Sequence, residues 1–141
     1  AKNRALYGPI LAGVIEMGKA VSEAEYQQIL LRRAIFRAEV EVLCATVDLI
    51  LTPVQPFAPL TLAAIATLGE QPDLIARLQR FTCPLDMSGH PALTFPAGIA
   101  KDGMPIGLQL LAGHFRELTL VRAGAAFQGR TAWHQRHPRI S

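Results

Sequence analysis

Residues 81–98, FTCPLDMSGHPALTFPAG, contain three prolines, two glycines and the polar side chains of Asp86, Ser88 and His90. Proline and glycine at these intervals interrupt regular structure, so we expect a short helical segment that turns into a strand at residues 92–95. The three polar residues are of the types found in a hydrolytic triad. In an extended chain, however, alternate residues lie about 6–7 Å apart, too far for hydrogen bonds, and we expect no self-contained triad here.

The segments that follow this stretch predict a hairpin and a helix. Residues 106–111 are the second strand candidate, and the pair Asp102-Gly103 between the two strands is a typical turn sequence. We therefore expect the two strands to pair antiparallel. Apolar residues at helical spacing then predict a helix over residues 116–128, ended by Gly129.

The segments that precede the stretch begin with a long helix. Ser22 and Glu25 form a capping box, and the apolar stripe that follows predicts a helix over residues 22–45. Residues 47–51 then predict a buried strand that contains one carboxylate, Asp48. We expect this carboxylate to accept hydrogen bonds from backbone amides at the start of the strand. We favour this structural role over a functional one.

Two short helices are expected between this strand and the proline-rich stretch. They cover residues 61–68 and 73–80, the first ended by Gly69 and the second capped by Asp73. The resulting order of helices and strands defines an α/β fold. The chain by itself has too few strands to complete the sheet of such a fold.

Length and composition indicate one globular unit. The 141 residues, half of them hydrophobic, can bury a core, so we treat 1–141 as one partial domain with a lead-in at 1–21 and a tail at 130–141. The net charge of +3 is spread along the chain, and we expect neither nucleic acid nor a membrane as a partner. Two widely spaced cysteines favour the reducing cytoplasm. The initial alanine suggests that the chain starts inside a longer reading frame.

Three further histidines could carry chemistry. His134 and His137 have a spacing that suits zinc on a helix, but two neighbouring arginines disfavour a metal dication, and we expect a solvated tail packed by Trp133. His114, at a strand end, is expected to make a hydrogen bond within its loop. No phosphate-binding glycine motif occurs in the sequence.

Three ordered motifs resemble the C-terminal half of the amidase signature family of hydrolases. They are DLILTPVQPFAP, FTCPLDMSGHPALTFPAG and GMPIGLQLLAGHFRELTLVRAGAAFQ, and the ending TAWHQRHP is also similar. The resemblance covers most of the chain from about Ser22 onward. It implies a mixed β-sheet covered by α-helices, of which this chain supplies the last strands.

The resemblance also implies a reaction, namely amide hydrolysis by a serine that a second serine and a lysine activate, without a metal or cofactor. Those catalytic residues belong to the family's N-terminal half. No Gly-Gly-Ser-Ser run occurs in this sequence, and Lys2, Lys19 and Lys101 have no serine-rich loop beside them. We therefore expect no catalytic residue in this chain, which would act with the N-terminal half of the same amidase on a small amide and be inactive alone.

Within the family resemblance, the FTCPLD segment implies substrate-binding positions at Thr82, Leu85 and Asp86. Asp86 stands at a position where the family most often has asparagine. A role that requires a neutral side-chain amide at this position is therefore in doubt. Gln79 stands where the glutamine-using branch usually has an acidic residue, which disfavours glutamine as the substrate. A glutamine-amidotransferase subunit for aminoacyl-tRNA and a noncatalytic binding module remain alternatives, and the oligomeric state is open, with a homodimer as one option.

Overall fold

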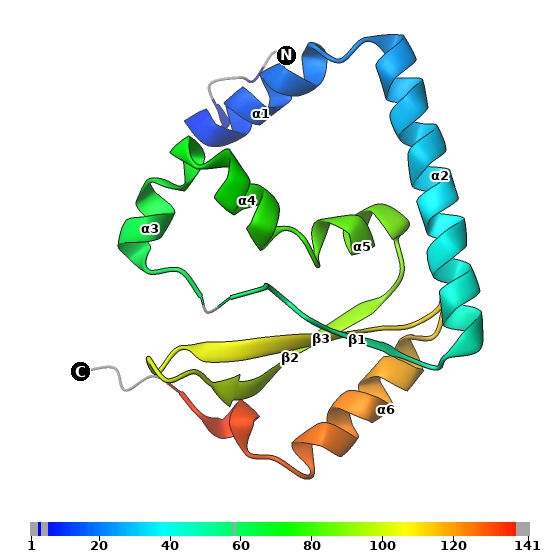
Figure 1. Cartoon of the computed structure of the whole chain (residues 1–141), viewed down its shortest axis with the longest axis vertical. Coiled ribbons are helices and arrows are strands. Elements are labelled where there is room, and N and C mark those ends of the chain that lie inside the picture. The colour runs from blue at the N-terminus through cyan, green and yellow to red at the C-terminus, as the bar shows by residue number, and fades with distance from the viewer. Residues whose placement is uncertain (1–2, 4–5, 58, 138–141) are drawn as a thin grey trace. The chain divides into compact units, whose positions relative to one another are not determined.

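The computed structural model describes residue 3, residues 6–57 and residues 59–137. The chain divides into two compact units, Ala1–Phe36 and Arg37–Ser141. The order of their elements can be followed in Figure 1. Two predictions fall partly outside the described residues, because Lys2 and the last four residues of the tail lie there. No described helix is long and apolar enough to cross a membrane.

The first unit consists of helix α1 (Pro9–Lys19) and the first part of helix α2 (Glu23–Thr46). No helix is predicted within residues 1–21, so α1 is a finding of the structure. The capping box is confirmed: the Glu25 carboxylate accepts hydrogen bonds from the Ser22 backbone N–H at 2.9 Å and from its hydroxyl at 2.7 Å. These bonds favour the ionised carboxylate and lower the pKa of Glu25.

The second unit contains a three-stranded antiparallel sheet of order β1-β3-β2. Its strands are β1 (Ile50–Pro53), β2 (Ala92–Ile99) and β3 (Pro105–Leu111). The predicted hairpin is confirmed, since β2 and β3 pair directly, with Leu93 opposite Leu110. Its turn is built as expected: Gly103 has a φ of 84°, and Asp102 accepts a bond from the backbone of Met104.

The first strand differs from its prediction in position and burial. Helix α2 continues to Thr46, so residues 47–49 must leave the helix before β1 can begin at Ile50. Asp48 therefore precedes the strand instead of interrupting it. The strand is also only half covered, because it lies at an edge of the sheet among the described residues, and Leu51 is 57% exposed.

The remaining helices follow the predicted order with one difference at a cap. Asp73 does not cap α4; the N-cap is Gln71, and Pro72 occupies the first turn, where a missing N–H costs nothing. Thr61 caps α3 as its hydroxyl accepts a bond from the Ala64 N–H. The helices are α3 (Leu62–Ala66), α4 (Pro72–Leu78), α5 (Cys83–Ser88) and α6 (Glu117–Gln128), with short 3₁₀ turns at Leu68–Glu70 and Trp133–Gln135.

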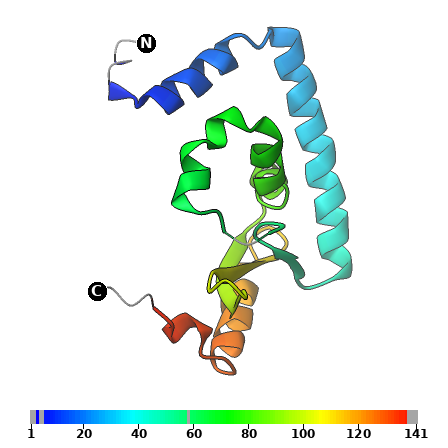
Figure 2. The ribbon, with the colours of Figure 1, turned by 60° about the vertical axis from the view of Figure 1, so that its left-hand side comes forward.

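The core of the second unit lies between the sheet and helix α6, on the opposite side of the sheet from α3, α4 and α5 (Figures 1 and 2). Helix α6 comes close to strand β2 at Gly124, where a Cβ atom would lie 2.6 Å from the side chain of Leu93. Phe95 and Phe127 add a tilted ring pair with centroids 4.7 Å apart. Among the described residues, the buried apolar side chains are Val40 and Cys44 on α2 together with Phe95, Leu111, Ala112 and Leu120.

Candidate functional site

Helix α5 is held against the sheet by a buried glutamine. Gln109, in the central strand β3, is 5% exposed and donates hydrogen bonds from Nε2 to the Phe81 carbonyl at 2.8 Å and to the Thr52 hydroxyl at 3.0 Å. These bonds connect β3 to the neighbouring strand β1 and to the residue that precedes Thr82. A buried amide that lost these partners would cost about 1–3 kcal/mol, so Gln109 fixes the start of α5.

The three predicted substrate-binding residues lie on one side of α5. Thr82 is the N-cap, and Leu85 and Asp86 follow three and four residues later, the spacing that places helix residues on a common face. Thr82 and Leu85 are half-buried, whereas Asp86 is exposed. We call these three residues the α5 face. No side-chain hydrogen bond or ion pair holds Asp86 among the described residues, so its carboxylate is available to a ligand.

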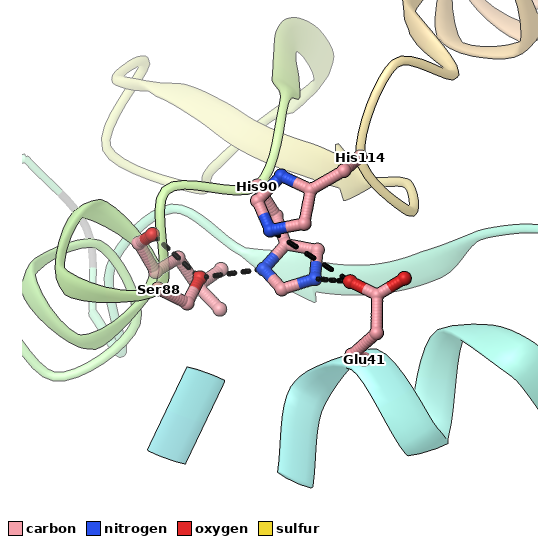
Figure 3. Close-up of polar contacts among 5 residues, drawn as sticks. Glu41, Ser88, His90 and His114 are labelled. Atoms are coloured by element: carbon pink, nitrogen blue, oxygen red, sulfur yellow. Dashed lines mark hydrogen bonds and ion pairs between the residues drawn. The ribbon is translucent and has the colours of Figure 1, made fainter. Parts of the chain in front are cut away.

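The other end of α5 leads into a buried polar array. Gly89 ends the helix with a φ of 73°, a conformation that L side chains rarely adopt, and this reversal brings Ser88 and His90 together. His90 Nδ1 lies 3.0 Å from Ser88 Oγ, and His90 Nε2 lies 3.0 Å from Glu41 Oε2 (Figure 3). The Ser88 hydroxyl also donates to the Leu85 carbonyl at 2.8 Å.

This array corrects the predicted separation of Ser88 and His90. An extended chain would place them too far apart for a hydrogen bond, but the left-handed Gly89 folds the backbone back. Their acidic partner is Glu41 from α2, not Asp86. Since Ser88 has no exposed surface, this serine cannot present a nucleophile to a substrate.

His114 joins the same group from the loop after β3. Its ring stacks on the His90 ring with centroids 4.0 Å apart, and its Nε2 lies 3.7 Å from Glu41 Oε2. The predicted loop hydrogen bond is not made by this nitrogen, which is buried and has no hydrogen-bond partner among the described atoms. We call Glu41, Ser88, His90 and His114 the histidine cluster.

Two further side chains, those of Asp48 and Cys44, have structural explanations. Asp48 is exposed and forms an ion pair with Arg116 at 3.2 Å, so the expected bonds to backbone amides are replaced by a surface pair. Burial, and then the nearby Glu41 carboxylate, raise the pKa of the Cys44 thiol. Cys44 therefore remains a neutral thiol at neutral pH and is a poor nucleophile.

The described part of the tail packs through its aromatic residue. Trp133 is half-buried, and the Arg136 guanidinium lies 4.7 Å from the centre of its ring, a cation–π contact. His134 is half-buried and His137 is exposed. Neither is among the described His, Cys, Asp and Glu residues that group closely enough to hold a metal ion.

A shallow apolar groove lies elsewhere on the second unit. It has a volume of about 350 Å³ and runs between the loop after β1 and the β2–β3 hairpin. A Cβ atom at Gly107 would lie 3.2 Å from Val54, so this glycine allows the loop to approach the hairpin. The residues of the α5 face do not line this groove, which is formed by Val54, Gln55, Pro59, Thr94, Phe95, Pro96, Pro105, Ile106 and Gly107.

Two important residues were not singled out from the sequence. Gln109 carried a usable signal, because it is the one polar side chain in the strand PIGLQLL. Glu41 carried none, since it is one of several charged residues on the long helix α2. Its role follows only from the fold, which brings it to a histidine 49 residues away.

The fold is similar to part of the fold of solved amidase-type structures. The structure of 6-aminohexanoate cyclic dimer hydrolase aligns with 89% of this chain at a TM-score of 0.70 and 24% identity, and the aligned part is 28% of that enzyme. A structure titled "Crystal structure of amidase" aligns with 92% of this chain and 30% of its own at a TM-score of 0.72 and 22% identity. At such identities these likenesses describe the fold alone.

The chain belongs to the amidase family, because the family model described as Amidase matches residues 2–121. The "Putative amidase AmiD" of Mycobacterium bovis is 40% identical over 134 residues, which are 95% of this chain and 28% of that protein. A glutamyl-tRNA(Gln) amidotransferase subunit of Moorella thermoacetica is 33% identical over 134 residues, or 93% of this chain and 26% of that protein. The chain therefore spans about a quarter of the length of these relatives, and the predicted family is confirmed.

Proposed function

We propose that this chain is the C-terminal part of an amidase that hydrolyses an amide-type carbon–nitrogen bond in a small molecule. The observation that carries the proposal is membership of the amidase family combined with a span of 28% of a relative named as an amidase. The sequence contains no Gly-Gly-Ser-Ser run. The nucleophile then belongs to the polypeptide that precedes Ala1.

The proposed chemistry is covalent catalysis by a serine, a second serine and a lysine, with no metal in the reaction. The nucleophilic serine attacks the amide carbonyl, its proton passes through the second serine to the leaving amine, and water then hydrolyses the acyl-enzyme ester. No residue of this chain takes part in these bond changes. Its contribution is the sheet and the α5 face.

We assign substrate contact to Thr82, Leu85 and Asp86. Two features of the structure support this assignment: the bonds of Gln109 fix the start of α5, and the Asp86 carboxylate has no protein partner among the described residues. An ionised carboxylate accepts hydrogen bonds and donates none, so Asp86 favours substrates that present an N–H group or a positive charge. Leu85 supplies the apolar contact beside it.

The catalytic proposal is tested by the preceding coding sequence and by activity. The gene is expected to continue upstream of Ala1 and to encode a glycine- and serine-rich segment. The intact protein should hydrolyse simple amides after treatment with a chelator, and the 141-residue chain alone should not. An initiator methionine directly before Ala1, or hydrolysis by the isolated chain, would contradict the proposal.

The assignment of Leu85 is tested by enlarging the proposed substrate pocket. Leu85→Ala should change the ratio of kcat/KM for a bulky and a small amide by about tenfold, because each methylene in an apolar pocket contributes about 1–3 kcal/mol to discrimination. Leu118→Ala, at a leucine on α6 that is 61% exposed, is the matched control and should leave the ratio unchanged. An equal ratio in both variants would remove Leu85 from the substrate site.

A second candidate is the glutamine-using branch of the family. It is favoured by the similarity to the glutamyl-tRNA(Gln) amidotransferase of Moorella thermoacetica and disfavoured by Gln79, which stands where that branch usually has an acidic residue. An intact protein that hydrolyses glutamine faster than simple amides would select this candidate. The opposite preference would exclude it.

We also propose a cytoplasmic location. Cys44 and Cys83 are both free thiols, which supports a reducing compartment. Cell fractionation of the native protein tests this assignment, and recovery of the protein outside the cytoplasm would overturn it.

A further inference from the structure

Three side chains of the second unit bring potential ligand atoms close together. Glu41 comes from α2, His90 from the segment between α5 and β2, and His114 from the loop after β3. One nitrogen or oxygen atom of each lies within 4.8 Å of the others. The close-up in Figure 3 shows the three side chains side by side. Three separate parts of the fold therefore meet at a mixed imidazole and carboxylate site.

The hydrogen bonds of Ser88 and His90 indicate which atoms of the histidine cluster present lone pairs. The Ser88 hydroxyl has one hydrogen, and its 2.8 Å bond to the Leu85 carbonyl uses it. His90 Nδ1, 3.0 Å from the same hydroxyl oxygen, must then carry a hydrogen and donate it. A neutral His90 consequently turns the lone pair of Nε2 toward the Glu41 carboxylate, 3.0 Å away.

Two acceptors at 3.0 Å repel each other unless a cation lies between them. A proton on His90 Nε2 satisfies that one contact, but it leaves His114 Nε2, which is buried and without a hydrogen-bond partner among the described atoms. This second nitrogen lies 3.7 Å from the same oxygen of Glu41. A single metal ion can accept a lone pair from all three atoms together, whereas a single proton joins at most two of them.

The distances suit a small tetrahedral ion. Bonds of about 2.0–2.1 Å from zinc to nitrogen or oxygen place neighbouring ligand atoms about 3.3–3.4 Å apart. The observed separations from Glu41 Oε2, 3.0 Å to His90 and 3.7 Å to His114, lie on either side of this value. The bond from Nδ1 of His90 to Ser88 is the kind of outer contact that orients a metal-binding imidazole.

We propose that Glu41, His90 and His114 bind a divalent transition-metal cation of the zinc class. Imidazole nitrogens select such ions over magnesium and calcium, which prefer oxygen ligands. The Glu41 side chain is 53% exposed, so an ion can enter from solvent and complete its coordination with water. The proposal is independent of the proposed amidase reaction, and the ion is assigned no part in it.

Binding requires one local movement. The rings of His90 and His114 are stacked with an angle of 24° between them, so their in-plane lone pairs lie in two separate, nearly parallel planes and do not meet at one point. His114 must tilt away from His90 to direct its Nε2 at the ion. The Ser88 bond holds His90 in place, so the movement belongs to His114.

Calorimetric titration of the intact, chelator-treated protein with zinc chloride tests the site. We expect one saturable site and a rise in Tm when zinc is added. Glu41→Gln and His114→Ala should each weaken binding by about tenfold or more and remove the rise in Tm. These two variants carry the test because His90→Ala removes a buried side chain and lowers stability by itself.

The matched control is His134→Ala, which deletes a half-buried histidine outside the cluster and should leave zinc binding unchanged. Cobalt chloride provides a second readout, since a tetrahedral site containing histidine gives visible absorption bands that His114→Ala should abolish. Absence of saturable zinc binding, equal affinity in the wild type and in both cluster variants, or loss of binding in His134→Ala would each overturn the proposal.

Discussion

The two sides of helix α5 use polar residues in opposite ways. On one side, Ser88 and the adjoining His90 are buried, and hydrogen bonds link them to the Leu85 carbonyl and to Glu41. On the other side, Thr82 is half-buried and the Asp86 carboxylate is exposed, with no side-chain partner among the described residues. The difference separates residues that hold the helix in place from residues that remain free for a ligand, although all four lie within ten positions.

The largest expected loss of stability is at His90. His90→Ala removes a buried ring and two hydrogen bonds, and we expect it to lower the free energy of unfolding of the intact protein by about 2–4 kcal/mol. Denaturant unfolding measures the change. His137→Ala, at an exposed histidine, should stay within about 0.5 kcal/mol of the wild type. Equal effects of the two substitutions would show that the buried side of α5 does not stabilise the fold.

The next prediction concerns the anchor of α5 on the sheet. Gln109→Leu keeps a side chain of similar size but leaves the Phe81 carbonyl and the Thr52 hydroxyl without their donor. We expect a loss of about 1–3 kcal/mol in the free energy of unfolding. Gln128→Leu, at an exposed glutamine in α6, is the control and should change it little. A neutral Gln109→Leu would mean that water replaces the lost donor.

A smaller effect is expected at the turn that joins the two sides. Gly89→Ala places a side chain at a φ of 73° and should cost about 1 kcal/mol, although no atom lies within 4 Å of the new Cβ. Gly13→Ala has the same open surroundings but lies inside helix α1, so it should stabilise by about 1 kcal/mol. Thermal unfolding of both variants measures the two changes in stability. Changes of the same sign would contradict the explanation by backbone conformation.

Local features of the sequence predicted much of this arrangement. The capping box at Ser22, the Asp102-Gly103 turn and the helical spacing of residues 116–128 each depend on neighbours a few positions apart, and the structure confirms all three. The predicted start of β1 was wrong by three residues because residues 47–49 connect α2 to the strand, and no local signal marks this connection.

The contacts that build the candidate sites depend on distant parts of the chain. The bond between Glu41 and His90 spans 49 residues, and the bond between Gln109 and Phe81 spans 28. Such pairs form only when helices and strands pack together, so residue spacing alone does not reveal them. The expected separation of Ser88 and His90 failed for a related reason: the prediction assumed an extended chain where Gly89 is left-handed.

Asp86→Asn in the intact protein has the smallest expected effect on stability. It also tests most directly whether the two sides of α5 have different roles. Because Asp86 is exposed and has no protein partner among the described residues, the substitution should leave the free energy of unfolding within about 0.5 kcal/mol. Removing the charge should nevertheless lower kcat/KM for a cationic amide about tenfold relative to a neutral amide of the same size. Unchanged kinetics, or a loss of stability as large as that of His90→Ala, would contradict the division between the two sides of α5.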